Sequence, residues 1–293
     1  MQTGTTCESD ERKLDLPSLA PHTSFCSEDL ISEDVGCSLL DAAVILANRF
    51  TVFGQRYRPY WVMSDAAAGS ALFYAWLFAR HFPQVSGATL GAAVLMALLF
   101  YKIVLEVKAA LGRTAARSFL QDCVTVIIPC FLLVCRLVKQ PLNLALGFLG
   151  TLMPLYGCLA RVGCFLGGCC YGRPSSRGVL YPASIFELPS DSWRKYAPSP
   201  NPGVRVFPIQ LVEAAAQGVL FALLATLVWK RVCAASSAFW LYLSLYASIR
   251  FVLDFYRTTS ARPRYGRFSE AQLACLAVQA IALGALIYAS RLR

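Results

Sequence analysis

Three charged residues near the C-terminal end of the chain stand at helical spacing inside an otherwise apolar stretch. Arg250, Asp254 and Arg257 occupy positions i, i+4 and i+7, so a helix would place all three on one face. A guanidinium binds phosphate oxygens through paired hydrogen bonds, and a carboxylate can hold two such groups together. The pattern therefore predicts a cationic pocket for a phosphate. A structural Arg-Asp pair, with Arg257 extended to the lipid headgroups, is the alternative.

A second polar set follows Pro208, at the beginning of another apolar stretch. Gln210, Glu213 and Gln217 share one face of the helix that this stretch predicts. Polar side chains in an apolar helix are expected to face the interior of a bundle or a water-filled cavity. We therefore expect Gln210 and Glu213 to line a cavity, although hydrogen bonding between helices would explain the stripe nearly as well.

A glycine-rich segment, ARVGCFLGGCCYGRP, precedes both sets and carries Arg161 near its beginning. Gly163, Gly168 and Gly172 allow a tight turn in which the backbone approaches a ligand closely. Glycine-rich loops also bind phosphates, but a P-loop needs Lys followed by Ser or Thr, and this segment lacks that pair. We take the segment as part of a binding site that is not a P-loop.

The same segment holds three cysteines, Cys164, Cys169 and Cys170. A metal or redox site is one interpretation of this group. Their spacing is not a C-x-x-C pair, and the two histidines of the chain, His22 and His81, stand far away in the sequence. We therefore expect small buried thiols, with no metal and no cofactor.

The composition explains which elements must position these residues. Hydrophobic residues make up 57% of the 293 and charged residues only 15%, whereas soluble domains average about 25% charged. A soluble protein is therefore excluded. Seven apolar stretches are long enough to cross about 30 Å of hydrocarbon, where only helices satisfy the backbone. They run over Tyr60–Phe78, Ser86–Val107, Ser118–Val138, Leu142–Leu159, Ile209–Trp229, Ala238–Phe255 and Phe268–Tyr288.

Segments of different composition flank the spans. Residues 1–40 carry eight of the 17 acidic residues and a smaller share of apolar residues than the rest of the chain, which predicts a disordered acidic tail. Leu39–Phe53 is short and contains charges, so we expect an interfacial amphipathic segment. Residues 173–207 contain six prolines and form the one long extramembrane loop. We predict an all-α polytopic membrane protein with about seven transmembrane helices, divided into a tail at 1–40 and a transmembrane domain at 41–293.

The net charge of +10 arises entirely from the transmembrane part, because the tail is acidic. The basic residues stand singly between apolar runs instead of forming a clustered stripe. This distribution argues against nucleic acid as a partner and favours anionic lipid headgroups.

At these three places the sequence resembles the prolipoprotein diacylglyceryl transferase family of bacterial inner-membrane enzymes. The family signature G/A-R-x-G-N/C-F-x-x-G-x-x-x-G is matched by Ala160–Gly172. The motif P-x-Q-L-x-E is matched by Pro208–Glu213, and R-F-x-x-E/D-F-x-R by Arg250–Arg257. A last span opened by a Gln-containing segment, Ser269–Gln272, follows. Three motifs in the same order make a chance match improbable, and the resemblance covers about residues 140–290 well.

The resemblance implies a seven-span transferase of lipoprotein biosynthesis in the bacterial inner (cytoplasmic) membrane. It would move a diacylglyceryl group from phosphatidylglycerol to the lipobox cysteine thiol of a prolipoprotein. Arg161 and Arg250 would bind the phosphate as catalytic residues, and Asp254 with Arg257 would hold this clamp in shape. The substrate-binding set would comprise Arg161, Gly163, Gly168, Gly172, Gln210, Glu213, Arg250 and Arg257. Its partners would be phosphatidylglycerol, a prolipoprotein and membrane lipids, with no nucleic acid.

One departure from the family concerns the start of the third span. Members commonly carry a catalytic histidine in a His-Gly-Gly segment there, whereas this chain has SFLQDC over Ser118–Cys123. We expect Asp122 to serve as the catalytic base, because a desolvated carboxyl has a raised pKa. Two alternatives follow from the missing histidine: a related lipid transferase with another acceptor, and a non-catalytic phospholipid-binding membrane protein.

The orientation in the membrane has two competing indications. Lys and Arg are more numerous on the face shared by the N-terminus and the loops after the second, fourth and sixth spans, which predicts that this face is cytoplasmic. The resemblance places the signature, and with it the same face, on the outer side. We follow the resemblance, because arginines of the motifs inflate the count.

Overall fold

The computed structural model describes residues 38–49, 51–52, 55–56, 58–110, 123–182, 204–257 and 264–291. The tail predicted for residues 1–40 lies outside the described residues up to position 37. The loop predicted for residues 173–207 is described at 173–182 and 204–207 only. Asp122 also lies outside the described residues.

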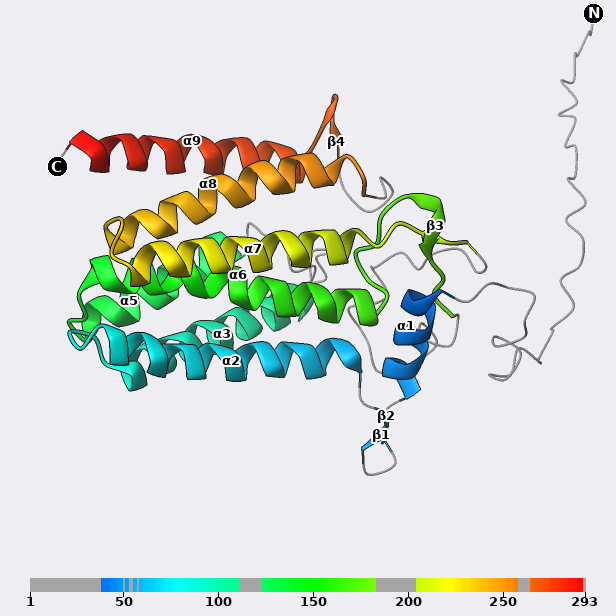
Figure 1. Ribbon diagram of the computed structural model, residues 1–293, viewed down its shortest axis with the longest axis horizontal. Helices are drawn as coiled ribbons and strands as arrows, with labels where there is room; N and C mark the ends of the chain where they lie inside the picture. The colour runs from blue at the N-terminus through cyan, green and yellow to red at the C-terminus, as the bar shows by residue number, and fades with distance from the viewer. Residues whose placement is uncertain are drawn as a thin grey trace, which may run out of the picture. The chain divides into compact units, whose positions relative to one another are not determined.

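Helices make up most of the described chain, and the strands are short (Figure 1). In order, the elements are α1 (Leu39–Arg49), β1 (Thr51–Val52), β2 (Gln55–Arg56), α2 (Pro59–His81), α3 (Gly87–Ala110), the π-helical η2 (Cys123–Ile127), α5 (Ile128–Leu137), α6 (Leu142–Leu166), β3 (Pro174–Val179), α7 (Ile209–Trp229), α8 (Ala235–Asp254), β4 (Arg264–Tyr265), β5 (Phe268–Ser269) and α9 (Glu270–Arg291). β1 pairs with β2, and β4 pairs with β5, both antiparallel.

Six helices are long and apolar enough to cross a membrane within the described part of the chain: α2, α3, α6, α7, α8 and α9. The prediction of an all-α membrane protein is confirmed, and six of the predicted spans coincide with these helices. The remaining one, predicted over Ser118–Val138, is described only from Cys123. There the chain forms a shorter apolar helix, Thr125–Leu137.

The bundle is organised around α6, which packs against α2, α7 and α8 (Figure 1). α9 packs on α8, and α3 packs on α2 and α5. Phe148 of α6 lies in the core, where its ring stacks on Tyr74 of α2 and Phe131 of α5 with centroid separations of 5.8 and 5.9 Å. Large apolar side chains such as Phe73 and Ile281 remain exposed on the outer faces, as lipid tails permit.

The close approach of α6 and α8 depends on two glycines. A Cβ atom on Gly150 would lie 2.4 Å from the backbone nitrogen of Phe239, and one on Gly147 would lie 2.6 Å from the Cβ of Ala235. Small residues at helix interfaces let backbones come together in membrane bundles. These glycines therefore set the distance between α6 and α8, the helices that carry Arg161 and Arg250.

We expect Gly150→Ala to lower the thermal unfolding midpoint of the purified protein in detergent. The added methyl group must displace backbone atoms of α8, and overpacking of this kind costs about 1–3 kcal/mol. Gly69→Ala is the matched control, because Gly69 lies in the spanning helix α2 with nothing within 4 Å of an added Cβ. That variant should keep or raise the midpoint. Equal midpoints for the two variants would contradict the tight contact between α6 and α8.

The helix α1 packs over one end of the bundle instead of running along it (Figure 1). Its Val44 is fully buried in a small core with Phe165, Tyr171, Val179, Tyr181 and Val206. Asp41 accepts hydrogen bonds from the Leu180 amide at 2.7 Å and from Arg205 Nη1 at 2.9 Å. Burial raises the pKa of Asp41, but these hydrogen bonds and those from Ser38 outweigh burial and lower it below the ordinary value. The segment that we expect at the membrane interface therefore contains the helix α1, which these contacts anchor to the described parts of the 173–207 loop.

Candidate functional site

A buried carboxylate on α7 contacts three arginines from other parts of the bundle. The side chain of Glu213 has no exposed surface, and its Oε1 lies 3.1 Å from Nη2 of Arg161 on α6. Its Oε2 lies 3.6 Å from Nη1 of Arg250 on α8 and also pairs with Nη2 of Arg257. Arg257 follows the end of α8. We call Arg161, Glu213, Arg250 and Arg257 the arginine cluster.

Neighbouring groups on α8 and β5 hold the cluster in position. The Tyr246 hydroxyl donates to Glu213 Oε1 at 2.6 Å. Asp254 Oδ1 lies 3.6 Å from Nη2 of Arg250, and Ser269 donates its hydroxyl hydrogen to the same carboxylate. Tyr246 stands four residues before Arg250, and Asp254 four residues after it, so one face of α8 carries all three. Of the three residues whose spacing predicted a phosphate pocket, Arg250 and Asp254 lie on one face of α8, whereas Arg257 follows the end of the helix and pairs with Glu213.

The charges of the five side chains in these ion pairs do not cancel. Three guanidiniums meet the carboxylates of Glu213 and Asp254, which leaves one net positive charge among the five. Within the described residues, Arg250 Nη1 and Arg257 Nε are buried without a hydrogen-bond acceptor. A buried donor that lacks an acceptor is costly. The site therefore favours an anion whose oxygens can accept from these nitrogens.

The three arginines of the cluster differ in how much of their side-chain surface is exposed. The side chain of Arg250 is 2% exposed and that of Arg257 7%, whereas Arg161 keeps 20% of its side-chain surface exposed. Arg161 therefore forms the outer part of the cluster, and the other two line its interior. An anion that enters the cluster would meet Arg161 first.

The glycine-rich segment connects the end of α6 to the arginine cluster. Gly172 donates its amide to the Phe207 carbonyl at 2.9 Å, and the Arg173 amide donates to the Tyr256 carbonyl at 3.0 Å. Gly172 also forms an isolated antiparallel bridge with Arg257. A Cβ on Gly172 would lie 2.8 Å from the Phe207 carbonyl oxygen, so the segment packs tightly at this position. The tight contacts that glycine permits here are with protein backbone.

Gly163 and Gly168 are each needed as glycine, but for different structural reasons. A Cβ on Gly163 would lie 2.9 Å from the Cβ of Met63, so this glycine lets α6 approach α2. Gly168 has φ of 68°, a left-handed conformation that glycine adopts without strain. The turn at Gly168 directs the chain back toward the bundle, where Gln210 Nε2 donates to the Cys169 carbonyl at 2.7 Å.

The turn also gathers the three cysteines. The sulfur atoms of Cys164, Cys169 and Cys170 all lie within 4.8 Å of one another. The first two are buried, and Cys170 is exposed. The neighbouring thiols of Cys164 and Cys169, followed by the charges of Arg257 and Arg161, hold the pKa of Cys170 well below its ordinary value despite the opposing effect of burial.

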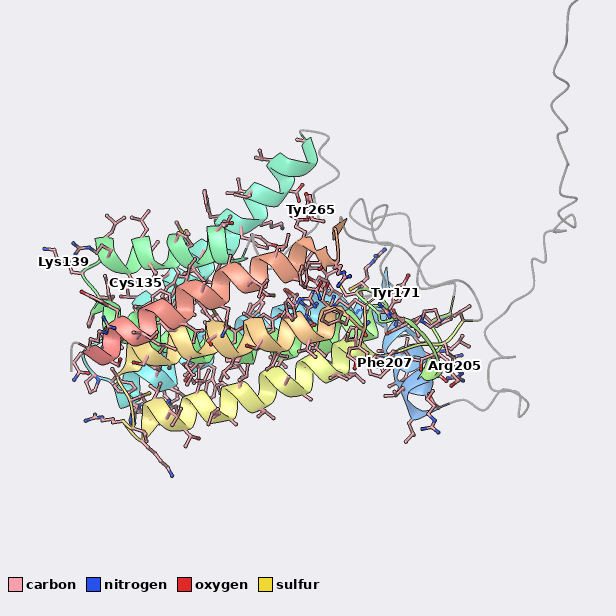
Figure 2. The ribbon with its side chains drawn as sticks, turned by 90° about the horizontal axis from the view of Figure 1, so that it is seen from above. Cys135, Lys139, Tyr171, Arg205, Phe207 and Tyr265 are labelled. Carbon is pink, nitrogen blue, oxygen red and sulfur yellow. The ribbon has the colours of Figure 1, made fainter. Side chains whose placement is uncertain are left out.

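Most of the residues selected from the sequence come together at this end of the bundle. Figure 2 shows Tyr171, Arg205 and Phe207 near the glycine-rich segment, opposite Cys135 and Lys139 at the other end. The predicted residues that the structure assembles here are Arg161, Gly163, Gly168, Gly172, Gln210, Glu213, Arg250, Asp254 and Arg257. The predicted base Asp122 lies outside the described residues, and its role stays a prediction.

Two features of the site were not anticipated. Glu213, expected only to line a cavity, is the carboxylate that three arginines share. Tyr246 and Ser269, which orient Glu213 and Asp254, were not selected at all. Helical spacing was the available signal for Tyr246, because it lies on the same face as Arg250. Ser269 begins the Gln-containing segment of the last span but carries no pattern of its own.

The fold and the site define a multi-pass membrane protein with a buried, positively charged cluster at one end of its helices. The comparison with protein families makes this class specific. Residues 82–288 match the family model of prolipoprotein diacylglyceryl transferase, and the chain belongs to this family. Membership implies diacylglyceryl transfer to prolipoproteins with a phosphatidylglycerol donor, and the family is typical of the cytoplasmic membrane. A search of curated proteins finds no match to the chain.

Proposed function

We propose that this chain is an active transferase that moves the diacylglyceryl group of phosphatidylglycerol to the lipobox cysteine thiol of a prolipoprotein in the bacterial inner membrane. In this reaction the acceptor sulfur attacks a glycerol carbon and forms a C–S bond. The C–O bond to the phosphate breaks, and its electron pair leaves with glycerol phosphate. The thiol proton is lost before or during the attack, because the thiolate is the nucleophile.

The observation that carries the proposal is the excess of buried guanidinium donors around Glu213. The arginine cluster and Asp254 together carry one net positive charge, which a phosphodiester with one negative charge would neutralise. The acceptor-free nitrogens of Arg250 and Arg257 provide hydrogen bonds for its oxygens. Arg161, the most exposed of the three, is placed to contact the headgroup as it enters.

The same cluster supports catalysis as well as binding. The departing phosphate changes from a monoanion in the diester to a species that approaches a dianion as the C–O bond breaks. Fixed guanidiniums stabilise this developing charge more than they stabilise the ground state. Glu213, Asp254 and their hydroxyl donors prevent the arginines from moving apart, so little reorganisation is needed at the moment of reaction.

The other predicted residues complete the proposed site. Gln210 braces the glycine-rich segment through the Cys169 carbonyl, and Gly163, Gly168 and Gly172 shape the segment beside the cluster. Asp122 is the proposed base for the acceptor thiol. We assign the transferase domain to residues 41–293 and leave the acidic tail, residues 1–40, outside it.

The test is complementation in bacterial cells that are depleted of their own prolipoprotein diacylglyceryl transferase. Expression of the full chain should add one diacylglyceryl group to a reporter lipoprotein, measured by mass spectrometry of the intact protein. Unmodified precursor in cells whose membranes contain the chain would overturn the proposed function. Binding of phosphatidylglycerol vesicles by such an inactive chain would identify a lipid-binding protein without transferase activity.

A further inference from the structure

The thiol group at the end of α6 has the composition of a metal site. Cys164 lies in the last turn of α6, and Cys169 and Cys170 follow the turn at Gly168. Their three sulfur atoms lie within 4.8 Å of one another, close enough for one ion to be held by all three. The three cysteines do not contain a C-x-x-C pair, and it is the turn at Gly168 that brings their sulfur atoms together.

The backbone around the thiols is held by specific contacts. Cys170 has φ of 59°, which is uncommon for a residue with a side chain, and Gly168 before it has φ of 68°. The Cys169 sulfur lies 3.7 Å from the Cys164 carbonyl oxygen, and Gln210 binds the Cys169 carbonyl. Surrounding structure must impose such a backbone conformation, since it is not the one a cysteine prefers.

Three cysteine thiols, which lose their protons when they bind a metal, define the class of ion. Sulfur ligands select soft or borderline cations such as Zn²⁺, and catalytic zinc sites use three protein ligands with one position open. Among the described residues, no fourth His, Cys, Asp or Glu joins this group. Cys170 is exposed and provides a route of entry.

The thiol group lies beside the arginine cluster. Cys164 is three residues after Arg161 on the same helix, so their side chains emerge from neighbouring positions. Gln210, which binds the Cys169 carbonyl, is three residues before Glu213 on α7. A metal ion bound by the three cysteines would therefore lie close to Arg161. A further ligand on that ion would be near a phosphate that Arg161 binds.

We propose that Cys164, Cys169 and Cys170 bind Zn²⁺ and that the open position of the ion takes the acceptor cysteine as a thiolate. This inference rests on the proposed function.

Coordination to the ion removes the proton of the acceptor thiol, which passes to solvent, so Asp122 is not needed as the base in this step. The coordinated sulfur then forms the C–S bond as the C–O bond to phosphate breaks and glycerol phosphate leaves. The thioether product is uncharged and a poorer ligand, so it is released. A bound Zn²⁺ would contradict the expectation of no metal. It would also take over the catalytic role of the histidine that this chain lacks.

Metal binding is tested first, without lipid or acceptor. The full chain, purified under reducing conditions and incubated with Zn²⁺, should retain about one ion per chain after desalting. With Co²⁺ alone it should show a thiolate-to-cobalt charge-transfer band. In a variant with serine at all three positions, the retained Zn²⁺ and the intensity of the cobalt band should each fall roughly tenfold. A serine hydroxyl is a much poorer ligand for Zn²⁺ than a thiolate. Cys130→Ser, on α5 and outside the group, is the matched control and should keep them.

The role of the open position is tested with a second probe. A peptide with a lipobox cysteine should change the cobalt band, and the same peptide with serine at that position should not. This readout does not need turnover, so it separates failure of the proposal from failure of the proposed transferase function. The absence of bound metal in the reduced protein, a disulfide among the three cysteines that persists under reducing conditions, or equal effects of the two peptides would overturn the proposal.

Discussion

Replacing Glu213 with glutamine should strongly destabilise the protein and reduce the amount that folds into the membrane. The side chain of Glu213 is fully buried and pairs with Arg161, Arg250 and Arg257, so its loss leaves three guanidiniums near one another without the shared carboxylate. Removal of one partner from a buried ion pair costs about 3–5 kcal/mol. The measurement is the thermal unfolding midpoint of purified protein in detergent, together with the yield of membrane-inserted protein.

Glu106→Gln provides the matched control for Glu213→Gln. Glu106 lies on α3, and its side chain is exposed. The same chemical change there should leave the midpoint close to that of the unmodified protein. If Glu213→Gln had the same midpoint and yield as Glu106→Gln, the arginine cluster would not depend on its carboxylate.

Replacing Arg161 with alanine should abolish most of the transferase activity while the protein stays folded. Arg161 is the most exposed arginine of the cluster, and Glu213 keeps two other arginines and Tyr246 after its removal. The loss of a fixed donor that stabilises transition-state charge costs about 10²- to 10³-fold in rate. The measurement is the initial rate of transfer from phosphatidylglycerol vesicles to a lipobox peptide, with the thermal midpoint recorded for each variant.

Two further variants sharpen the test of Arg161. Arg161→Lys keeps the positive charge but loses the planar fork that binds two phosphate oxygens, so its rate should lie between those of the unmodified protein and Arg161→Ala. Arg136→Ala removes an exposed arginine at the end of α5, away from the cluster, and should leave the rate unchanged. Loss of folded protein in Arg161→Ala, in place of lost activity, would indicate a structural role for this arginine.

The predicted spans agree with the described helices because their physical cause is local. A helix that crosses hydrocarbon needs a continuous apolar stretch, and each stretch of sequence reveals its own length and ends at Pro, Gly or charged residues. α6 through α9 were placed within several residues. The third span was the exception, since the structure describes only its shorter C-terminal part, Thr125–Leu137.

The candidate residues were visible because charge is rare in this chain. With 15% charged residues, each Arg, Asp or Glu in an apolar stretch demands an explanation, and helical spacing placed Arg250, Asp254 and Arg257 on one face. Spacing on one helix does not reveal which residue of another helix will lie opposite. For that reason the sequence indicated Asp254 as the carboxylate between the arginines, whereas Arg257 pairs with Glu213 of α7.

By itself, the sequence determined the class of this protein, the order of its spans, and the family motifs that contain its charged residues. Those properties follow from hydropathy and from periodicity along one segment, which neighbouring segments do not alter. Only the tertiary structure decided that Glu213 joins Arg161, Arg250 and Arg257, and that Cys164 meets Cys169 and Cys170. These contacts depend on the glycine-mediated approach of α6 to α8 and on the turn at Gly168, because they join atoms from separate elements.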